Sequence, residues 1–372
     1  MVNPVEQTDV FVAGGGPAGL AAAIAAARHG LSVVVADPAQ PPIDKACGEG
    51  LMPEGLKALR ALGVAIEPTD GRVFRGIRFC QAGHSVEAQF PDAYGLGMRR
   101  PRLHSLLVHH AEKLGVRFCW GTRVDGLTEN GVLVNGRILR SRWIVGADGQ
   151  NSSVRKWAGL DASRSYSQRF GFRRHFHIAP WTDHVEVHWG DRCQAYVTPV
   201  ADDEICVALI SRDRRTRFDQ LYAEFPELAQ RLQGVPASSA LKGSVTVTRG
   251  FNAVARGSVA LIGEASGSVD AITGEGMALT FQQAIALGDA LAAGDLAAYR
   301  AAHRHIGRLA VGMARLMLTM DRRPWLQRRV LRAFAAQPVL FPRMLAIHVG
   351  ALRPVQLGIS VGAALAWQLL TA

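Results

Sequence analysis

Three spaced glycines follow the first apolar segment of the chain, in the order Gly14-Gly15-Gly16-Pro17-Ala18-Gly19. In a G-x-G-x-x-G pattern, the first glycine permits a tight turn and the second lets a pyrophosphate approach the backbone. The third lets a helix pack closely on a strand. The N–H groups at the start of that helix favour bound phosphate. These residue types predict a dinucleotide site, against the alternative of a structural unit that merely uses glycines.

An acid lies at the far end of the same unit. Residues 31–36 form a second apolar run, which ends at Asp37. A carboxylate in that place can accept hydrogen bonds from a ribose. We therefore expect residues 10–13 to form a strand, an alanine-rich helix to follow Gly19, and a second strand to deliver Asp37. These elements alone do not say which dinucleotide is bound.

Two later glycine-containing motifs have similar chemistry. The first is Gly146-Ala147-Asp148-Gly149, which follows an apolar strand and precedes serines able to cap a short helix. The second begins with Gly263-Glu264 and continues through Gly274-Glu275-Gly276-Met277 at the start of another predicted helix. Glycines at a helix N-terminus let backbone N–H groups face an electron-rich ligand atom. Taken singly, each motif could also be an ordinary turn between a strand and a helix.

The three motifs in this order resemble the FAD-binding pattern of the para-hydroxybenzoate hydroxylase-like flavoproteins, over roughly residues 8–295. That superfamily includes aromatic hydroxylases, flavin halogenases and geranylgeranyl reductases. The resemblance implies that the glycine turn holds the FAD pyrophosphate, that Asp37 holds the adenosine ribose, and that Arg100 lies near the phosphates. The full set of implied cofactor-binding residues is Gly14, Gly16, Pro17, Ala18, Gly19, Asp37, Arg100, Asp148, Gly149, Gly263, Glu264, Gly274, Glu275, Gly276 and Met277. NAD(P)H is expected as a transient reductant, because no second glycine-rich nucleotide fold is visible.

Two acids depart from the family pattern by one methylene each. Asp37 stands where the family usually has glutamate, and Glu264 stands where it usually has aspartate.

Residues 45–53 resemble an element of the geranylgeranyl-reductase-like branch that lies beside the flavin and the substrate. This likeness makes Cys47, Gly48 and Glu49 candidates for the substrate pocket, although Cys47 could also be a small packing residue. Tyr196 and Pro199 are further candidates, but the segment between them lacks the tryptophan and phenylalanine typical of that branch. The branch therefore fits this region only in part.

Basic residues on the predicted strands of the same region offer a second set of candidates. They are Arg173, Arg174, His175, His177 and His188. Each side chain could either face the pocket or be exposed to solvent or paired with a neighbouring side chain. No metal-ligand spacing is found among the twelve histidines, so no metal site is expected.

The order of motifs predicts an α/β fold in which a Rossmann-like FAD-binding domain of the glutathione-reductase type is interleaved with a β-rich substrate domain. The FAD-binding domain is expected at residues 1–75, 96–165 and 250–300, and the substrate domain at residues 76–95 and 166–249. A helical, basic C-terminal arm covers residues 301–372. Within the substrate domain, one helix is expected near residues 218–232.

Charge is concentrated in that arm. The whole chain has a formal net charge of +11, and residues 301–372 contain ten arginines, no lysine and one acid. Arg304, Arg308 and Arg315 share one helical face, and a further group of arginines surrounds Trp325. A basic, tryptophan-containing arm fits a membrane surface or an acidic acyl-carrier-type protein, and no nucleic-acid motif accompanies it. The alternative is a solvated helical cap folded over the substrate domain, which we favour for residues 301–320, whereas we favour the interface for the residues beyond.

The uncharged residues 355–372 are marginal in length for a membrane-spanning helix. The cysteines are five in number and scattered, and no secretory signal is visible. These features predict a cytoplasmic protein, with a peripheral protein on the inner face of the membrane as the alternative.

These observations favour an FAD-dependent oxidoreductase, and most of all an NAD(P)H- and O2-dependent monooxygenase of an apolar or aromatic small molecule, for instance in secondary metabolism. One alternative is a geranylgeranyl-reductase-like flavoprotein that saturates C=C bonds of an isoprenoid or lipid. A second is a non-catalytic, membrane-associated flavoprotein. A halogenase is disfavoured, since no Trp-x-Trp-x-Ile-Pro-like segment is found.

Overall fold

A parallel sheet lies at the centre of the nucleotide-binding part of the computed structural model, which describes residues 7–353 and 356. Strand β1 (Gln7–Ala13) lies between β2 (Val33–Asp37) and β11 (Arg137–Gly146), parallel to both. The sheet continues to β8 (Arg117–Trp120) beyond β2, and to β18 (Val259–Leu261) and β17 (Ala255–Arg256) beyond β11. The hairpin of β9 (Val124–Thr128) and β10 (Gly131–Val134) extends the edge of β11. These strands are rich in buried valine, as expected where helices cover a parallel sheet.

Alanine and glycine allow the covering helices to approach closely. Helix α1 (Pro17–Arg28) follows the glycine turn, and nine of its residues are buried. It packs on α3 (Arg100–Lys113) and α7 (Gly276–Ala293), while α2 (Pro53–Ala61) packs on α7. A methyl group on Gly288 of α7 would lie only 2.7 Å from the Cβ of Ala25, so this helix pair needs glycine there. The packing fixes the α1 N-terminus against the sheet.

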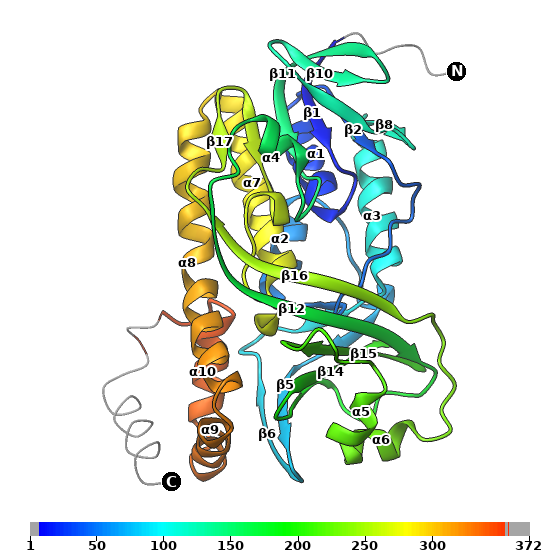
Figure 1. The fold of residues 1–372 in the computed structure, drawn as a ribbon, viewed down its shortest axis with the longest axis vertical. Coiled ribbons are helices and arrows are strands. Elements are labelled where there is room, and N and C mark those ends of the chain that lie inside the picture. Colours follow the sequence, from blue (N-terminus) through cyan, green and yellow to red (C-terminus); the bar gives the residue numbers. More distant parts are fainter. Residues whose placement is uncertain (1–6, 354–355, 357–372) are drawn as a thin grey trace.

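A second sheet carries the β-rich region. Its seven strands lie in the order β16 (Lys242–Phe251), β12 (Ser163–Phe176), β15 (Glu204–Ser211), β14 (Cys193–Ala201), β13 (His184–Trp189), β5 (Gly76–Gln81) and β6 (His84–Gln89). The long strands β12 and β16 run from the first sheet across the middle of the molecule (Figure 1). A small sheet of β3 (Gly50–Leu51), β7 (Gly95–Gly97) and β4 (Arg72–Phe74) lies between the two regions.

The remaining short elements include one correction. The single helix expected near residues 218–232 is two helices, α5 (Gln220–Glu224) and α6 (Pro226–Leu232). Pro226 restricts the preceding residue, and Phe225 adopts φ −130° and ψ 75° rather than helical angles. Ser152 caps α4 (Ser153–Trp157) by accepting a hydrogen bond from the N–H of Arg155 at 2.9 Å. The 3-10 helices within residues 7–353 are η1 (Pro68–Asp70), η2 (Gly263–Ala265) and η3 (Ala271–Thr273).

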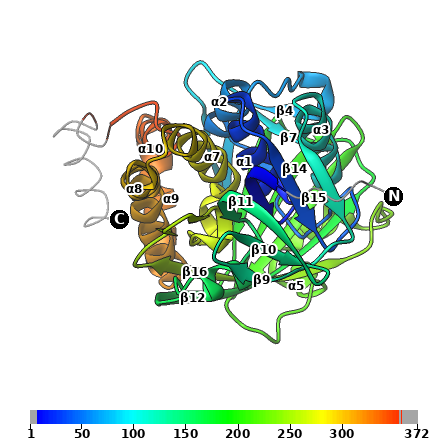
Figure 2. The ribbon, with the colours of Figure 1, turned by 90° about the horizontal axis from the view of Figure 1, so that it is seen from above.

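Three helices of the C-terminal arm form one flank of the molecule. They are α8 (Leu296–Asp321), α9 (Pro324–Ala336) and α10 (Leu340–His348), and they lie together in both views (Figures 1 and 2). The uncharged residues 355–372 fall, apart from Gln356, outside the described residues. Among the described helices, none is by itself long and apolar enough to span a membrane; α9 and α10 pass that test only together, and they are bent by 113°. The expected α/β architecture with a helical arm is confirmed.

Candidate functional site

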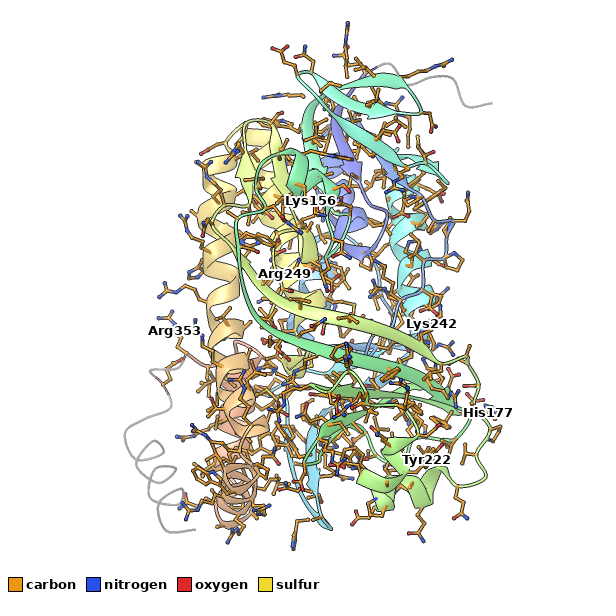
Figure 3. The ribbon with its side chains drawn as sticks, in the orientation of Figure 1. Lys156, His177, Tyr222, Lys242, Arg249 and Arg353 are labelled. Atoms are coloured by element: carbon orange, nitrogen blue, oxygen red, sulfur yellow. The ribbon has the colours of Figure 1, made fainter. Side chains whose placement is uncertain are left out.

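A cavity of about 990 Å³ lies between the two sheets and the C-terminal helices. Residues from all three glycine-containing motifs line it, together with strands of the second sheet and α8, α9 and α10. Arg249 on β16, labelled in Figure 3, lies at the middle of the molecule where the two sheets meet. The fold thus brings segments that are far apart in sequence to one cavity.

The glycine turn shows three different environments for its three glycines. Gly14 has φ +110°, and a Cβ on it would overlap the carbonyl oxygen of Ala147. A Cβ on Gly19 would overlap the carbonyl oxygen of Gly14. A Cβ on Gly16 would meet no atom within 4 Å, and Gly16 lines the cavity. Two of the glycines therefore serve the packing of the protein, whereas the third leaves room for a ligand beside the α1 N-terminus.

The carboxylate of Asp37 holds this turn in place. Its Oδ2 accepts a hydrogen bond from the N–H of Gly15 at 2.7 Å, and its Oδ1 accepts one from Ala39 at 2.8 Å. On the other side, Nε2 of the fully buried His104 lies 2.9 Å from the carbonyl oxygen of Gly15. Burial lowers the pKa of His104. The contact of Asp37 with a ribose stays a prediction. The contact between His104 and the Gly15 carbonyl was not indicated by any pattern in the sequence.

Arg100 and Asp148 carry buried polar atoms without partners among the described residues. The backbone N–H of Arg100 donates to Oε1 of Glu49 at 2.9 Å, while its side chain lines the cavity with Nε buried and unpartnered. Oδ2 of Asp148 accepts from the N–H groups of Ser153 at 2.7 Å and Val154 at 3.1 Å, and Oδ1 is unpartnered. An unpaired guanidinium N–H in a cavity fits a phosphate-bearing ligand.

The third motif places glycines and an acid at the cavity wall. Gly263, with φ +61°, and Gly274, with φ +70°, adopt the left-handed conformation that favours glycine. A Cβ on Gly276 would meet no atom within 4 Å, and Gly276, Glu264 and Met277 line the cavity. This wall stands at the start of α7, so the unbonded N–H groups of that helix face the same region.

Glu275 is buried behind this wall and is not among the lining residues. Burial, followed by the neighbouring charge of Glu54, raises its pKa to about 8. Burial also raises the pKa of Glu54 to about 7 and lowers that of His348 to about 4. His348 Nδ1 lies 3.8 Å from Glu275 Oε2. The sequence suggested Glu275 as a cofactor contact, but it did not indicate that Glu54 and His348 lie beside it.

Glu49 is the most connected residue of the predicted substrate element. It is buried with φ +58°, and its Oε2 lies 2.5 Å from Nε2 of His175. His175 in turn lies 2.7 Å from the hydroxyl of Ser239 through Nδ1. Cys47, Gly48 and Glu49 all line the cavity. The network ties this element to β12 and fixes the cavity wall.

The two other substrate candidates lie in different places. Tyr196 lines the cavity, and its hydroxyl donates to the carbonyl oxygen of Ile272 at 3.1 Å. Burial raises the pKa of Tyr196, so the phenol stays protonated. Pro199 is not among the cavity-lining residues, and its carbonyl oxygen lies close to Gly97 of the small sheet.

Of the five basic candidates on the second sheet, only Arg173 lines the cavity. Arg173 Nη2 pairs with Asp44 at 2.6 Å. His175 binds Glu49 behind the wall, and Arg174 stacks on the ring of Phe218. His188 pairs with Glu186, and Figure 3 shows His177 at the outer edge of the molecule.

Among the described residues, two groups of side chains contain metal-ligand atom types despite the lack of a spacing signal. One is Cys80, Glu186 and His188, where Arg78 Nη1 lies 3.4 Å from Oε1 of Glu186. The other lies beside the cavity. Atoms of Glu49, His175 and Cys206 lie within 4.8 Å of one another. Arg173 Nη2 is 3.8 Å from Oε1 of Glu49. The adjoining positive charge fits an ion-pair network better than a cation site.

The far end of the cavity is apolar, and most of its wall comes from the C-terminal helices. Its side chains are methionine, leucine, valine and phenylalanine: Met317, Met320, Leu326, Val330, Phe334, Phe341, Met344 and Leu345. Phe79 of β5 packs on Phe341 with ring centroids 4.6 Å apart. The sequence suggested that the arm is a cap or an interface, and it did not indicate that the arm builds this chamber.

Comparisons with known proteins agree with the geometry. The family described as FAD binding domain matches residues 7–296. A menaquinone reductase of Mycobacterium tuberculosis is 28% identical over 299 residues, 73% of each chain. A 6-methylpretetramide 4-monooxygenase of Streptomyces rimosus is 35% identical over 179 residues, 42% of each chain. The crystal structure of a flavoprotein/dehydrogenase from Cytophaga hutchinsonii has a TM-score of 0.81 at 17% identity, with 93% of each chain covered.

The family match covers well over half of the chain, and the unfilled space at Gly16 with the unpaired Nε of Arg100 fits the FAD pyrophosphate. The protein therefore belongs to the FAD binding domain family, as an FAD-dependent oxidoreductase of the para-hydroxybenzoate hydroxylase-like superfamily.

Proposed function

We propose that this oxidoreductase is an NAD(P)H- and O2-dependent monooxygenase that hydroxylates an aromatic compound with an apolar substituent. The observation that carries the proposal is the continuity of the cavity. It runs from Gly16 and Arg100, past Gly276 and Met277, into the apolar chamber of α8, α9 and α10. A ring held beside Met277 would leave its apolar substituent in that chamber.

The residues of this chain would hold and shield the reacting groups. Gly16 and Arg100 would hold the pyrophosphate of FAD, and Gly274 to Met277 would flank its ring system. Bound there, FAD supplies hydride acceptance from NAD(P)H and the activation of O2. The phenylalanines and methionines of the chamber exclude water from the substrate side.

Two polar groups on the substrate side can orient an aromatic hydroxyl. Arg173 lines the cavity and is held by Asp44 at 2.6 Å, so its position is fixed before a ligand arrives. Tyr196 lines the same space, and its hydroxyl is oriented by Ile272. Nε of Arg173 is buried without a partner among the described residues, so it could donate a hydrogen bond to a phenol oxygen and orient the ring.

A series of phenols with alkyl substituents of increasing length tests this proposal. We expect kcat/KM for substrate-dependent NAD(P)H oxidation to rise roughly fourfold for each added methylene until the chamber is filled, at about 0.8 kcal/mol per buried CH2. The Val330→Phe variant narrows the chamber and should lower the optimum length. Equal kcat/KM across the series, with the same optimum in the variant, would rule the chamber out as the substrate site.

A second candidate is the reduction of C=C bonds in an isoprenoid or lipid. It is favoured by the similarity to a menaquinone reductase over 73% of the chain and by the position of Cys47 at the cavity wall. This reaction consumes NAD(P)H without O2. Stoichiometric saturation of an isoprenoid quinone under strict anaerobiosis would establish it in place of hydroxylation.

A further inference from the structure

The exposed side of α8 combines positive charge with apolar side chains. Arg304, Arg308 and Arg315 are exposed and share one helical face. Val311 and Leu316 lie between and beside them, with 39% and 42% of their surface exposed. Arginines beside exposed apolar side chains are the composition of a helix that lies at a membrane surface.

Helix α9 continues the same character on the same flank. Trp325 is 50% exposed, and the guanidinium of Arg329 lies 5.5 Å from the centre of its ring. Arg328 and Arg332 are exposed on that helix as well. Figures 1 and 2 both place α9 next to α8, so the two helices lie on the same flank of the molecule.

This side of the molecule has no exposed carboxylate between Leu296 and Arg353. The single acid in that segment is Asp321, which is 4% exposed and pairs with Arg169 Nη2 at 2.8 Å. Within the described part of the chain, no ion pair to a carboxylate is found for Arg304, Arg308 or Arg315. Their charge is therefore left to attract an anionic partner.

The same residues stand at the opening of the cavity. Arg304, Arg308, Val311, Arg315 and Leu316 are exposed, yet they also line the cavity. The apolar chamber behind them is built from α8, α9 and α10 themselves. A molecule that enters past this rim moves directly into an apolar environment.

We propose that α8 and α9 dock this enzyme on the surface of an anionic phospholipid bilayer, with the cavity opening toward the lipid. Arginines would contact lipid phosphates, while Val311, Leu316 and Trp325 would enter the boundary between headgroups and acyl chains. The exposed apolar side chains favour a bilayer over an acidic soluble protein, which would need only the charges. The docking proposal depends only on the exposed residues of α8 and α9. The entry of an apolar substrate from the bilayer depends in addition on the proposed function.

Co-sedimentation with vesicles tests the docking without any measurement of activity. The flavin-loaded full chain is mixed with vesicles of phosphatidylcholine alone or with 30 mol% phosphatidylglycerol, at about 0.1 M and at higher salt. The test variant is R304Q/R308Q/R315Q. The control is R117Q/R137Q/R140Q, which removes three exposed arginines from β8 and β11 of the first sheet, outside the helical arm.

Each basic residue near such a surface raises binding roughly fivefold, so the test variant should bind the anionic vesicles about 100-fold more weakly. The control should bind as the wild type does, and high salt should weaken wild-type binding. Trp325→Ala should also reduce binding, because it removes the apolar contact. Flavin absorbance and thermal unfolding verify that each variant is folded.

Three results would overturn the docking proposal. The first is equal binding to neutral and anionic vesicles, and the second is an equal loss in the test and control variants. The third is binding of an acidic holo-acyl carrier protein, sensitive to the test variant, with no binding to vesicles. If vesicle binding behaves as expected but no phenol is hydroxylated, the docking stands and the proposed function fails.

Discussion

Adding one methyl group at Gly16 should separate FAD binding from folding. Gly16 has φ −72° and ψ 177°, which alanine adopts without strain, and its new Cβ would meet no protein atom within 4 Å. At Gly19, three residues along the same turn, a Cβ would overlap the carbonyl oxygen of Gly14. Gly16→Ala therefore fills ligand space, whereas Gly19→Ala forces the backbone of the protein apart.

The expected sizes follow from these two environments. For Gly16→Ala, the free energy of unfolding of the apoprotein should change by less than about 1 kcal/mol. Alanine is a slightly poorer helix N-cap than glycine, which lowers stability, but it also lowers the conformational entropy of the unfolded chain, which raises stability. FAD should bind about 10- to 100-fold more weakly, since the methyl group displaces a phosphate from charge-assisted hydrogen bonds of about 1.5–3 kcal/mol. Gly19→Ala should destabilise the apoprotein itself by about 1–3 kcal/mol.

Two measurements on the apoproteins check this. Urea unfolding gives the free energy of unfolding, and titration with FAD, followed by quenching of flavin fluorescence, gives the dissociation constant. A Gly16→Ala protein that binds FAD within threefold of the wild type would refute the placement of the pyrophosphate. Equal destabilisation by both substitutions would refute the division of roles between the glycines.

Two further predictions concern buried charges. Because the pKa of Glu275 is raised to about 8, the folded protein keeps a proton that the unfolded chain releases, so stability should fall by up to about 1.4 kcal/mol per pH unit as pH rises from 6.5 to 8. Urea unfolding of Glu275→Gln should show a flatter decline; an unchanged pH slope would contradict the raised pKa. Arg169 pairs with Asp270 at 2.9 Å and with Asp321 at 2.8 Å, all buried, so Arg169→Met should lose about 3–5 kcal/mol in the same assay. The matched Arg75→Met substitution removes an exposed ion pair and should change the free energy of unfolding by no more than about 0.5 kcal/mol. Equal losses of stability in the two variants would show that burial of the ion pair does not determine the loss.

The parts of the site that depend on local backbone geometry could be predicted from the sequence. Residues close together in sequence determine three of these parts: the glycine turn, the strand ending at Asp37 and the helix starting at Gly276. The division into a parallel sheet and a β-rich sheet was predictable for the same reason, since apolar runs and alternating runs differ in period.

Parts that depend on long-range contacts could not be predicted. Glu49 meets His175, which lies 126 residues away, and the intervening chain gives no spacing signal. His104 supports Gly15 across 89 residues. The chamber is built by helices whose apolar positions looked the same as those of any packed helix. Such long-range contacts depend on how the two sheets are arranged, which a single sequence does not reveal.

Oxygen isotope labelling tests the proposed reaction most directly. The purified protein is incubated with NAD(P)H, an alkyl-substituted phenol and ¹⁸O2, and the product is analysed by mass spectrometry. Hydroxylation predicts one ¹⁸O atom in the product, with NAD(P)H consumed in equal amount and no product without O2. A product that gains two hydrogens and no ¹⁸O, and forms equally well without O2, would contradict it.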